Sequence, residues 1–112
     1  MMDCSFDTAP GATIVTAHGK VDESSWEAFD GHLKDGISRA VAERSKMLII
    51  NLAYLDYMSS RGLRALTVAK RSADAAGVAI TLAAPNGVMR EILAISRYDK
   101  LFPVKDSVEL SL

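Results

Sequence analysis

The fold is decided by residues 48–63, which read Leu48-Ile49-Ile50-Asn51-Leu52-Ala53-Tyr54-Leu55-Asp56-Tyr57-Met58-Ser59-Ser60-Arg61-Gly62-Leu63. The run from Met47 to Leu52 is mostly apolar, which is typical of a strand covered on both faces. Tyr54 to Met58 has the pattern of a connector. A helix is predicted from Ser60 to Ala76, with Gly77 as its C-terminal signal. Two adjacent serines therefore lie where a buried strand passes into a helix.

The start of this helix can serve as a cap or as an anion site. The first backbone N–H groups of a helix have no partner inside it, and its N-terminus carries a partial positive charge. A serine hydroxyl can cap these groups, and a phosphate placed there is electrostatically favoured. Ser59 and Ser60 fit both interpretations. Gly62 lets either a neighbouring strand or a partner approach the helix start closely.

The rest of the chain alternates between strand and helix patterns. The other predicted strands are Cys4–Thr8, Ala12–His18 ended by Gly19, Val78–Ala84, and Leu101–Lys105 kept at an edge by Pro103. The other predicted helices start near Ser24, after the capping residue Asn86, and within Asp106–Leu112. Because the first two strands are joined by a short Pro10-Gly11 turn, we expect an α/β fold with a mixed β-sheet flanked by helices.

Apolar spacing predicts which face of each helix packs on the sheet. Ser24 and Glu27 have the spacing of a capping box at the start of the first helix. The predicted core faces are Trp26, Phe29, Leu33, Ile37 and Val41 in the first helix, Leu63, Leu66, Ala69 and Ala73 in the second, and Val88, Ile92 and Ile95 in the third, with Met89 and Leu93 as an adjoining row. Each face has steps of three and four residues, as core packing requires.

The opposite side of the second helix carries Arg61, Arg64, Val68 and Arg71. One interpretation is an ordinary solvated face. The other is a contact surface, with Ser60 at its end, that meets an acidic patch on a partner protein. Arginine is enriched at protein interfaces, and Val68 would form the apolar centre of this stripe.

Composition bounds the class of protein. The chain has 112 residues, 49% of them hydrophobic and 24% charged, so we expect residues 1–112 to form one domain with its own core. A net charge of -1 gives no overall field that would attract nucleic acid. The single cysteine cannot form an internal disulfide. No apolar run approaches the roughly 20 residues of a membrane helix, and no secretory pattern opens the chain. We therefore expect a cytoplasmic location without membrane insertion, although docking onto a membrane protein stays open.

Residues suited to catalysis are few. His18 and His32 are the only histidines, and neither has a nucleophile or an acid at motif spacing. The sequence has no Cys/His metal cluster and no glycine-rich phosphate loop. Asp56 follows a buried strand, as in a receiver domain, but the acidic pair that such domains carry after their first strand is absent, so Asp56 is interpreted as a turn residue. We expect a non-enzymatic protein without metal or cofactor.

Three segments carry a family resemblance. Met58-Ser59-Ser60-Arg61-Gly62-Leu63, soon after Asn51-Leu52, resembles the Asp-Ser-Ser-Gly-Leu or Asp-Ser-x-Gly-Leu signature of the anti-sigma-factor antagonist (STAS) family. Gly19-Lys20-Val21-Asp22 resembles the Gly-x-Leu-Asp that precedes the family's first helix. Residues 91–102 resemble its third helix and the Leu-Phe stretch that follows. The resemblance runs from about Ala12 to Phe102.

The resemblance implies a mixed sheet flanked by helices and a regulatory role. Family members bind an anti-sigma factor that is a serine kinase, are released when a serine at the start of the second helix is phosphorylated, and are reset by a phosphatase. By motif position that serine is Ser60, which implies a partner-binding site of Ser59, Ser60, Arg61 and Gly62 together with the stripe of Arg64, Val68 and Arg71.

Two positions depart from the family pattern. Ser59 stands in place of the usual aspartate, and Arg61 in place of a small residue. The first change leaves open whether Ser60 is phosphorylated, while Arg61 can pair with a phosphate or with an acidic partner. Non-switching members of the family act as scaffolds in signalling complexes or in transport assemblies, and this alternative stays open, as does the oligomeric state.

Overall fold

The computed structural model describes residues 2–112, and Met1, which the expected domain includes, lies outside them. Within this range the strands are β1 (Met2–Ala9), β2 (Ala12–Val21), β3 (Met47–Met58), β4 (Ala79–Ala83) and β5 (Val104–Lys105). The helices are α1 (Trp26–Ala42), α2 (Ser60–Ala75), α3 (Gly87–Ile95), α4 (Tyr98–Leu101) and α5 (Val108–Ser111). The five strands form one sheet in the order β1-β2-β3-β4-β5. β1 pairs with β2 antiparallel and the other neighbours pair parallel, which confirms the predicted mixed sheet flanked by helices.

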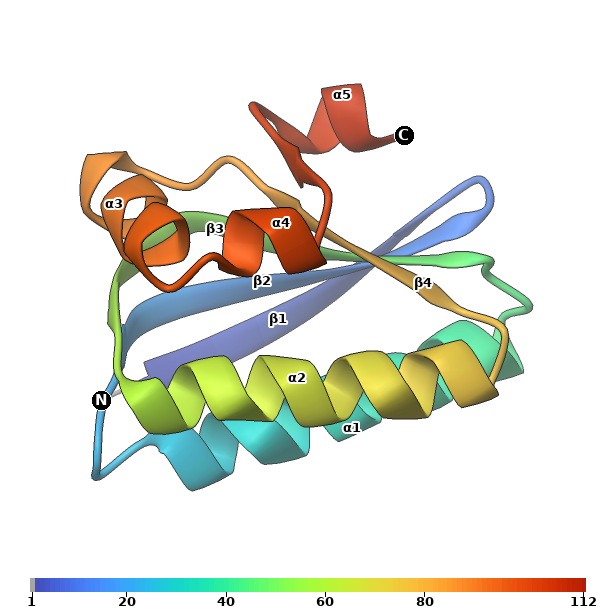
Figure 1. Cartoon of the computed structure of the whole chain (residues 1–112). Helices are drawn as coiled ribbons and strands as arrows, with labels where there is room; N and C mark the ends of the chain where they lie inside the picture. Colours follow the sequence, from blue (N-terminus) through green and yellow to red (C-terminus); the bar gives the residue numbers. More distant parts are fainter. Residues whose placement is uncertain (1) are drawn as a thin grey trace.

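The two faces of the sheet are covered unequally. α1 and α2 lie side by side along one face, and α5 lies on the other (Figure 1). Leu48, Ile50 and Leu52 of β3 belong to the main core with buried residues of α1, α2 and α3. Ile49 points the opposite way, into a small second cluster against which Val108 of α5 packs. This alternation explains why residues 47–50 of β3 are all apolar, as predicted for a strand covered on both faces.

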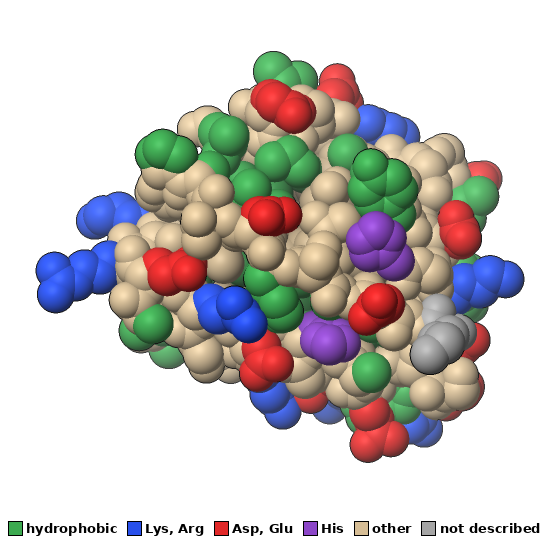
Figure 2. All heavy atoms as spheres, turned by 180° about the vertical axis from the view of Figure 1, so that it is seen from behind, with side chains coloured by type: hydrophobic (Ala, Val, Ile, Leu, Met, Phe, Trp, Pro, Cys, Tyr) green, Lys and Arg blue, Asp and Glu red, His purple; other side chains and the backbone are tan. Residues whose placement is uncertain are grey.

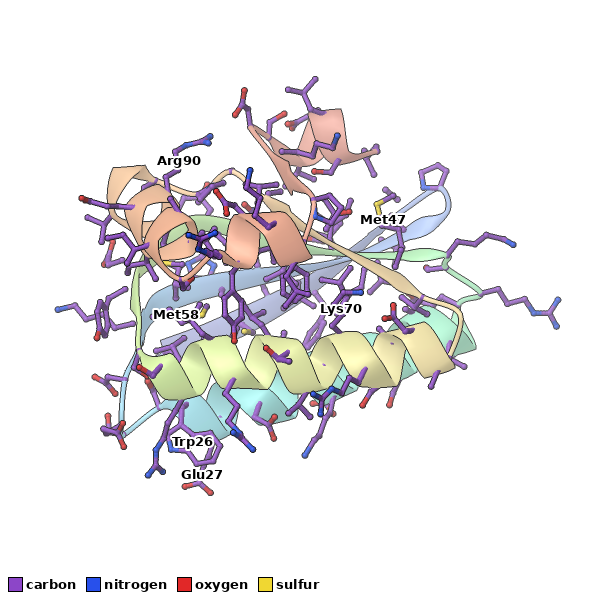
Figure 3. All side chains as sticks on the ribbon, viewed as in Figure 1. Trp26, Glu27, Met47, Met58, Lys70 and Arg90 are labelled. Carbon is purple, nitrogen blue, oxygen red and sulfur yellow. The ribbon has the colours of Figure 1, made fainter. Side chains whose placement is uncertain are left out.

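The first three strands are longer than predicted. The prediction that Tyr54 to Met58 forms a connector is wrong, because this segment continues β3 and pairs with β2 as far as Val21↔Met58. The pairing of β2 with β3 contains two register shifts, one between Thr16 and His18 and one between Gly19 and Lys20. Gly19 does not end β2 either. It adopts φ +101° beside one of these shifts, a conformation that glycine reaches without strain. Met47 and Met58 mark the two ends of β3 in Figure 3.

The start and end of α1 also differ from the prediction. The capping box of Ser24 and Glu27 is wrong, because α1 begins at Trp26 with Ser25 as its N-cap residue, and Ser24 donates its hydroxyl to Asp22 at 2.7 Å. The Ser24 hydroxyl is bonded to the Asp22 carboxylate and therefore does not cap the helix. Of the predicted core face, Phe29, Leu33 and Ile37 are buried and Trp26 is half-buried. Val41 is 51% exposed in the last turn of α1 and is a wrong prediction.

The third helix is rotated relative to the prediction. Met89 and Leu93 are buried, whereas Val88 and Ile95 are exposed, so the expected adjoining row is the true core face. Asn86 sets this rotation: its side-chain oxygen accepts from the N–H of Met89 and its amide donates to the carbonyl of Leu55, both at 2.9 Å. Because Asn86 caps α3 and is also hydrogen bonded to β3, the first turn of α3 is held in one orientation relative to the sheet.

The C-terminal segment has one more helix than predicted. Leu101 closes the short helix α4, so the expected strand Leu101–Lys105 shrinks to the two residues of β5. β5 does lie at the sheet edge, directly after Pro103. The expected last helix forms over Val108–Ser111.

Two glycines of α1 should respond oppositely to alanine. A Cβ at Gly36 would lie 2.8 Å from Cγ2 of Val15 and 3.3 Å from Cδ1 of Leu48, so α1 approaches the sheet only because this side chain is missing. Gly31 has nothing within 4 Å of the same position. Gly36→Ala should destabilise the protein by about 1 kcal/mol through overpacking. Gly31→Ala should stabilise it by about 1 kcal/mol through helix propensity. Urea midpoints of the two variants check this, and a shift in the same direction for both would contradict it.

Candidate functional site

The junction of β3 and α2 lies at the carboxyl ends of the parallel strands β2 and β3, where open α/β sheets usually bind their ligands. Ser59 is the N-cap residue of α2, and its hydroxyl accepts from the N–H of Gly62 at 3.4 Å. Its own N–H donates to the carbonyl of Val21 at 2.8 Å, which fixes the junction against the end of β2. Ser60 is the first residue of α2 and is exposed. The predicted helix start is confirmed, and Ser59 is the residue that caps it.

Gly62 is buried in the first turn of α2. A Cβ at this position would lie 2.5 Å from Cγ of Met58 and 2.7 Å from Cγ1 of Val21. The close approach that glycine permits is therefore made by the ends of β2 and β3. Through this contact the start of α2 packs directly on the strand ends. Ser60, in the same turn, is exposed.

The turn between β2 and α1 forms a second wall of the site. The Asp22 carboxylate accepts hydrogen bonds from the hydroxyl of Ser24 at 2.7 Å, from the hydroxyl of Ser25 at 3.0 Å and from the N–H of Ser24 at 2.9 Å. These bonds, that of the Ser24 hydroxyl first, lower the pKa of Asp22 because they favour its charged form. The buried Ser25 hydroxyl also lies 2.7 Å from the carbonyl of Lys20. The Gly19–Asp22 motif thus builds a closed turn beside Ser59.

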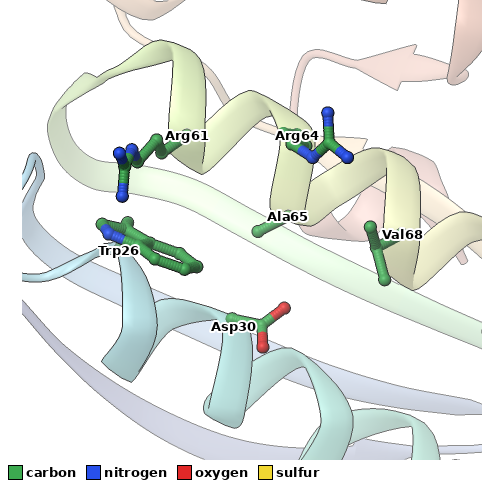
Figure 4. A pocket seen from close by; sticks show the side chains of 6 residues that line it. All are labelled: Trp26, Asp30, Arg61, Arg64, Ala65 and Val68. Carbon is green, nitrogen blue, oxygen red and sulfur yellow. The ribbon is translucent and has the colours of Figure 1, made fainter.

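Arg61 bridges this turn and α2. Its Nε lies 3.4 Å from a carboxylate oxygen of Glu23, and its guanidinium carbon lies 5.4 Å from the centre of the Trp26 ring. Figure 4 shows Arg61 above the indole of Trp26. Sequence reasoning assigned Trp26 to the core face of α1 and missed this contact. The capping-box interpretation placed the start of α1 too early, which hid the fact that Trp26 is its first residue.

Two hollows flank the exposed side of α2. One, of about 350 Å³, lies between α1 and α2 and is lined by Trp26, Asp30, Arg61, Arg64, Ala65 and Val68 (Figure 4). The other, of about 450 Å³, lies toward α4 and is lined by Ser60, Arg61, Arg64, Thr67, Val68, Arg71 and Tyr98. The hydroxyls of Thr67 and Tyr98 are hydrogen bonded at 2.8 Å, which links α2 to α4. Three members of the predicted stripe line both hollows and form the ridge that separates them: Arg61, Arg64 and Val68.

The structure brings most predicted site residues together. Ser60 and the stripe residues Arg61, Arg64, Val68 and Arg71 are all exposed and line one hollow. Ser59 and Gly62 line neither hollow. Ser59 caps the start of α2, and Gly62 lets that start pack closely on the strand ends. Arg64 and Arg71 take part in no ion pair within residues 2–112. The geometry is therefore a cationic surface with one exposed hydroxyl at its end.

Other reactive groups lie elsewhere. Both histidines are on the face shown in Figure 2, where they are coloured purple, and His18 stacks on Tyr54 with ring centres 5.0 Å apart. Burial, with a smaller contribution from the charge of Asp3, raises the pKa of the Cys4 thiol to about 12, so this thiol stays protonated at neutral pH. Across the part of the chain that is described, no three His, Cys, Asp or Glu side chains gather in a way that could hold a metal ion. None of the helices in this range has the length and apolar character needed to span a membrane.

Comparison with known proteins identifies relatives of the whole chain. BtrV of Bordetella bronchiseptica, named as a candidate anti-sigma factor antagonist, is 29% identical over 109 residues, which cover 96% of this chain and 90% of BtrV. The crystal structure of an anti-sigma factor antagonist from Mycobacterium paratuberculosis matches with a TM-score of 0.80 at 19% identity, over 97% of this chain and 89% of that one. The Bacillus cell fate determinant SpoIIAA in its phosphorylated form matches with a TM-score of 0.66 at 18% identity, over 97% and 96%.

These solved structures show that the fold is shared, and a family model gives the assignment. The model described as the STAS domain matches residues 4–111, which is nearly the whole chain. It includes the segment Met58–Leu63, on which the sequence resemblance was based, and all residues that line the two hollows. The chain belongs to the STAS domain family.

Proposed function

We propose that this chain is an anti-sigma factor antagonist that works by partner switching in the cytoplasm. It binds a cognate anti-sigma factor that is also a serine kinase, and it dissociates from this partner when Ser60 is phosphorylated. Relatives named as anti-sigma factor antagonists support the first part. The observation that carries the second part is the exposed hydroxyl of Ser60 at the first position of α2, beside a cationic surface.

The two serines divide the tasks that the sequence left open. Ser59 caps α2, so the helix does not need the hydroxyl of Ser60. Within residues 2–112 the Ser60 side chain makes no hydrogen bond, and the residue is exposed. Serine and aspartate are about equally good N-cap residues, so the replacement of the family's usual aspartate by Ser59 retains the cap. The exposed hydroxyl of Ser60 is therefore accessible to a kinase and is not needed to cap the helix.

Phosphorylation would act through local charge. Transfer from ATP forms a bond between Ser60 Oγ and the γ-phosphorus, breaks the bond from that phosphorus to ADP, and releases the hydroxyl proton to solvent. The product carries about -1.5 to -2 charges where the free hydroxyl carried none. Placed beside Arg61 and Arg64, this charge changes the electrostatics of the surface without refolding the domain. A serine phosphatase would reverse the step by hydrolysis.

The partner surface follows from the same residues. Arg64 and Arg71 are unpaired cations within the described residues, and Val68 supplies an exposed apolar side chain between them. This combination suits an acidic patch with an apolar centre. The ion pair with Glu23 and the contact with Trp26 draw Arg61 toward the turn between β2 and α1, although its side chain stays exposed.

A capture experiment with four proteins tests this function. Tagged wild type, Ser60→Ala, Ser60→Glu and Ser38→Glu are incubated with native lysate, and captured proteins are identified by mass spectrometry. We expect wild type, Ser60→Ala and Ser38→Glu to capture one anti-sigma kinase, and Ser60→Glu to capture at least tenfold less. Ser38→Glu is the matched control, because Ser38 is an exposed serine of α1 that lines neither hollow.

The captured kinase then completes the test. With ATP it should phosphorylate wild type at Ser60 and leave Ser60→Ala unmodified. If Ser60→Glu captures the same proteins as wild type in the same amounts, Ser60 is not a switch. A scaffold role without phosphorylation would then replace the proposal.

A further inference from the structure

The hollow beside Ser60 has the lining of an anion site. Of its seven lining residues, three are arginines, three carry hydroxyls and one is Val68, and none is a carboxylate. Its volume of about 450 Å³ far exceeds what a single phosphoryl group requires. The hydrogen bond between Thr67 and Tyr98 holds two of these lining hydroxyls in place.

Within this hollow Arg64 is the arginine best placed toward Ser60. Residues four apart on a helix are neighbours on its surface, and an anion four residues before a cation is the favourable order. Arg61, by contrast, contacts Glu23 and Trp26. The one carboxylate of α1 beside the hollows, Asp30, is paired with Lys34 at 3.0 Å and lines only the other hollow. The guanidinium of Arg64 is therefore available, and its fork of N–H donors matches a phosphate.

We propose that this hollow is a phosphoryl-binding site with Arg64 as its principal ligand, occupied by the phosphoryl group of Ser60 after modification. The inference rests on the proposed phosphorylation of Ser60. It adds a second action to the switch: the phosphoryl group withdraws Arg64 from the surface offered to the partner, in addition to placing negative charge there. Arg71 lies about three turns beyond Ser60 along α2 and adds only to the positive charge of the hollow.

A titration of the modified protein tests the assignment without any partner. Phosphoserine is installed at position 60 during synthesis, and the phosphorus-31 NMR signal is followed against pH. A phosphoserine has its second pKa near 6. Because a neighbouring cation favours the dianion, Arg64 should lower this pKa. We expect Arg64→Gln to raise it by about 0.5 units relative to wild type, a roughly threefold change in proton affinity, which is the scale of a surface pair.

The control is Arg44→Gln, which removes the same charge from an exposed turn after α1 and outside both hollows. It should leave the pKa of phosphoserine 60 at the wild-type value. If Arg64→Gln and Arg44→Gln shift this pKa equally, or neither shifts it, Arg64 does not bind the phosphoryl group and the inference is overturned.

A second arm identifies the source of the phosphoryl group. Inorganic phosphate is titrated into the unmodified protein while backbone amide signals of α2 are followed. If Arg64→Gln abolishes phosphate binding while the phosphoserine titration is the same in both proteins, the hollow serves an external phosphate and the inference fails. Neither arm uses the kinase, so failure here is distinct from failure of the proposed switch, which the capture experiment reports.

Discussion

Gly62→Ala should lower the free energy of unfolding by about 2 kcal/mol. The added Cβ would lie 2.5 Å from Cγ of Met58 and 2.7 Å from Cγ1 of Val21, distances at which something must move. Both neighbours are buried, and the β-branched Val21 has little rotamer freedom to yield. Overpacking of this kind costs about 1–3 kcal/mol, and the better helix propensity of alanine offsets only part of it. Urea unfolding followed by circular dichroism measures the change.

The matched control for Gly62 is Gly87, another glycine in the first turn of a helix. Nothing lies within 4 Å of a Cβ built on Gly87, so Gly87→Ala should be neutral or stabilise the protein by up to about 1 kcal/mol. If both variants unfold at the wild-type urea concentration, the contact between the start of α2 and the strand ends is looser than described. Because Ser60 lies in the same turn, Gly62→Ala should also weaken capture of the anti-sigma factor.

Reversing the charges of Arg64 and Arg71 together should weaken binding to the anti-sigma factor about 100-fold. Both side chains are exposed, line the hollow beside Ser60 and pair with no carboxylate within residues 2–112. If these two cations face an acidic patch, as we propose, replacing them by two glutamates creates like-charge contacts, which cost several kcal/mol across an interface. A 100-fold loss corresponds to about 2.7 kcal/mol. Titration calorimetry with the anti-sigma factor identified by the capture experiment measures it.

The control for the charge reversal is Arg44→Glu with Lys46→Glu. These two residues are exposed in the loop before β3, at the opposite end of that strand from α2, and the pair changes net charge by the same amount. This double variant should bind within a factor of about two or three of wild type at moderate salt, because charges beyond roughly a Debye length are screened. If both double variants weaken binding equally, the effect comes from a long-range electrostatic field, and the stripe is not a contact surface.

Local pattern was sufficient for much of the site. The steps of three and four in α2 correctly separated Leu66, Ala69 and Ala73, which are buried, from Arg64 and Arg71, which are exposed. The serine pair also correctly predicted the helix start, because an N-cap is made within four residues and depends on little else. Periodicity of one helix and the chemistry of its first turn are short-range properties, so the sequence carries them in full.

Predictions failed where a second segment decided the outcome. Tyr54–Met58 joins β3 because β2 lies beside it and the pairing tolerates two register shifts, which no feature of residues 54–58 alone announces. The rotation of α3 depends on a bond from Asn86 to Leu55, 31 residues apart. In both cases two arrangements satisfied the local pattern and a contact with a distant segment selected one. Ser24 is a different case, because the acceptor of its hydroxyl, Asp22, is a near neighbour in sequence and the local pattern offered two roles for one side chain.

The sequence by itself determined the α/β class, the STAS resemblance and the place of Ser60 at a helix start, since strand and helix periods and a six-residue motif are written along the chain. Only the tertiary structure decided that Arg61 contacts Glu23 and Trp26, and that Tyr98 of α4 closes a hollow around Ser60, Arg64 and Arg71. Arg61 and Glu23 lie 38 residues apart along the chain, as do Ser60 and Tyr98. They meet because α1 and α2 share one face of the sheet and the Thr67–Tyr98 hydrogen bond links α4 to α2.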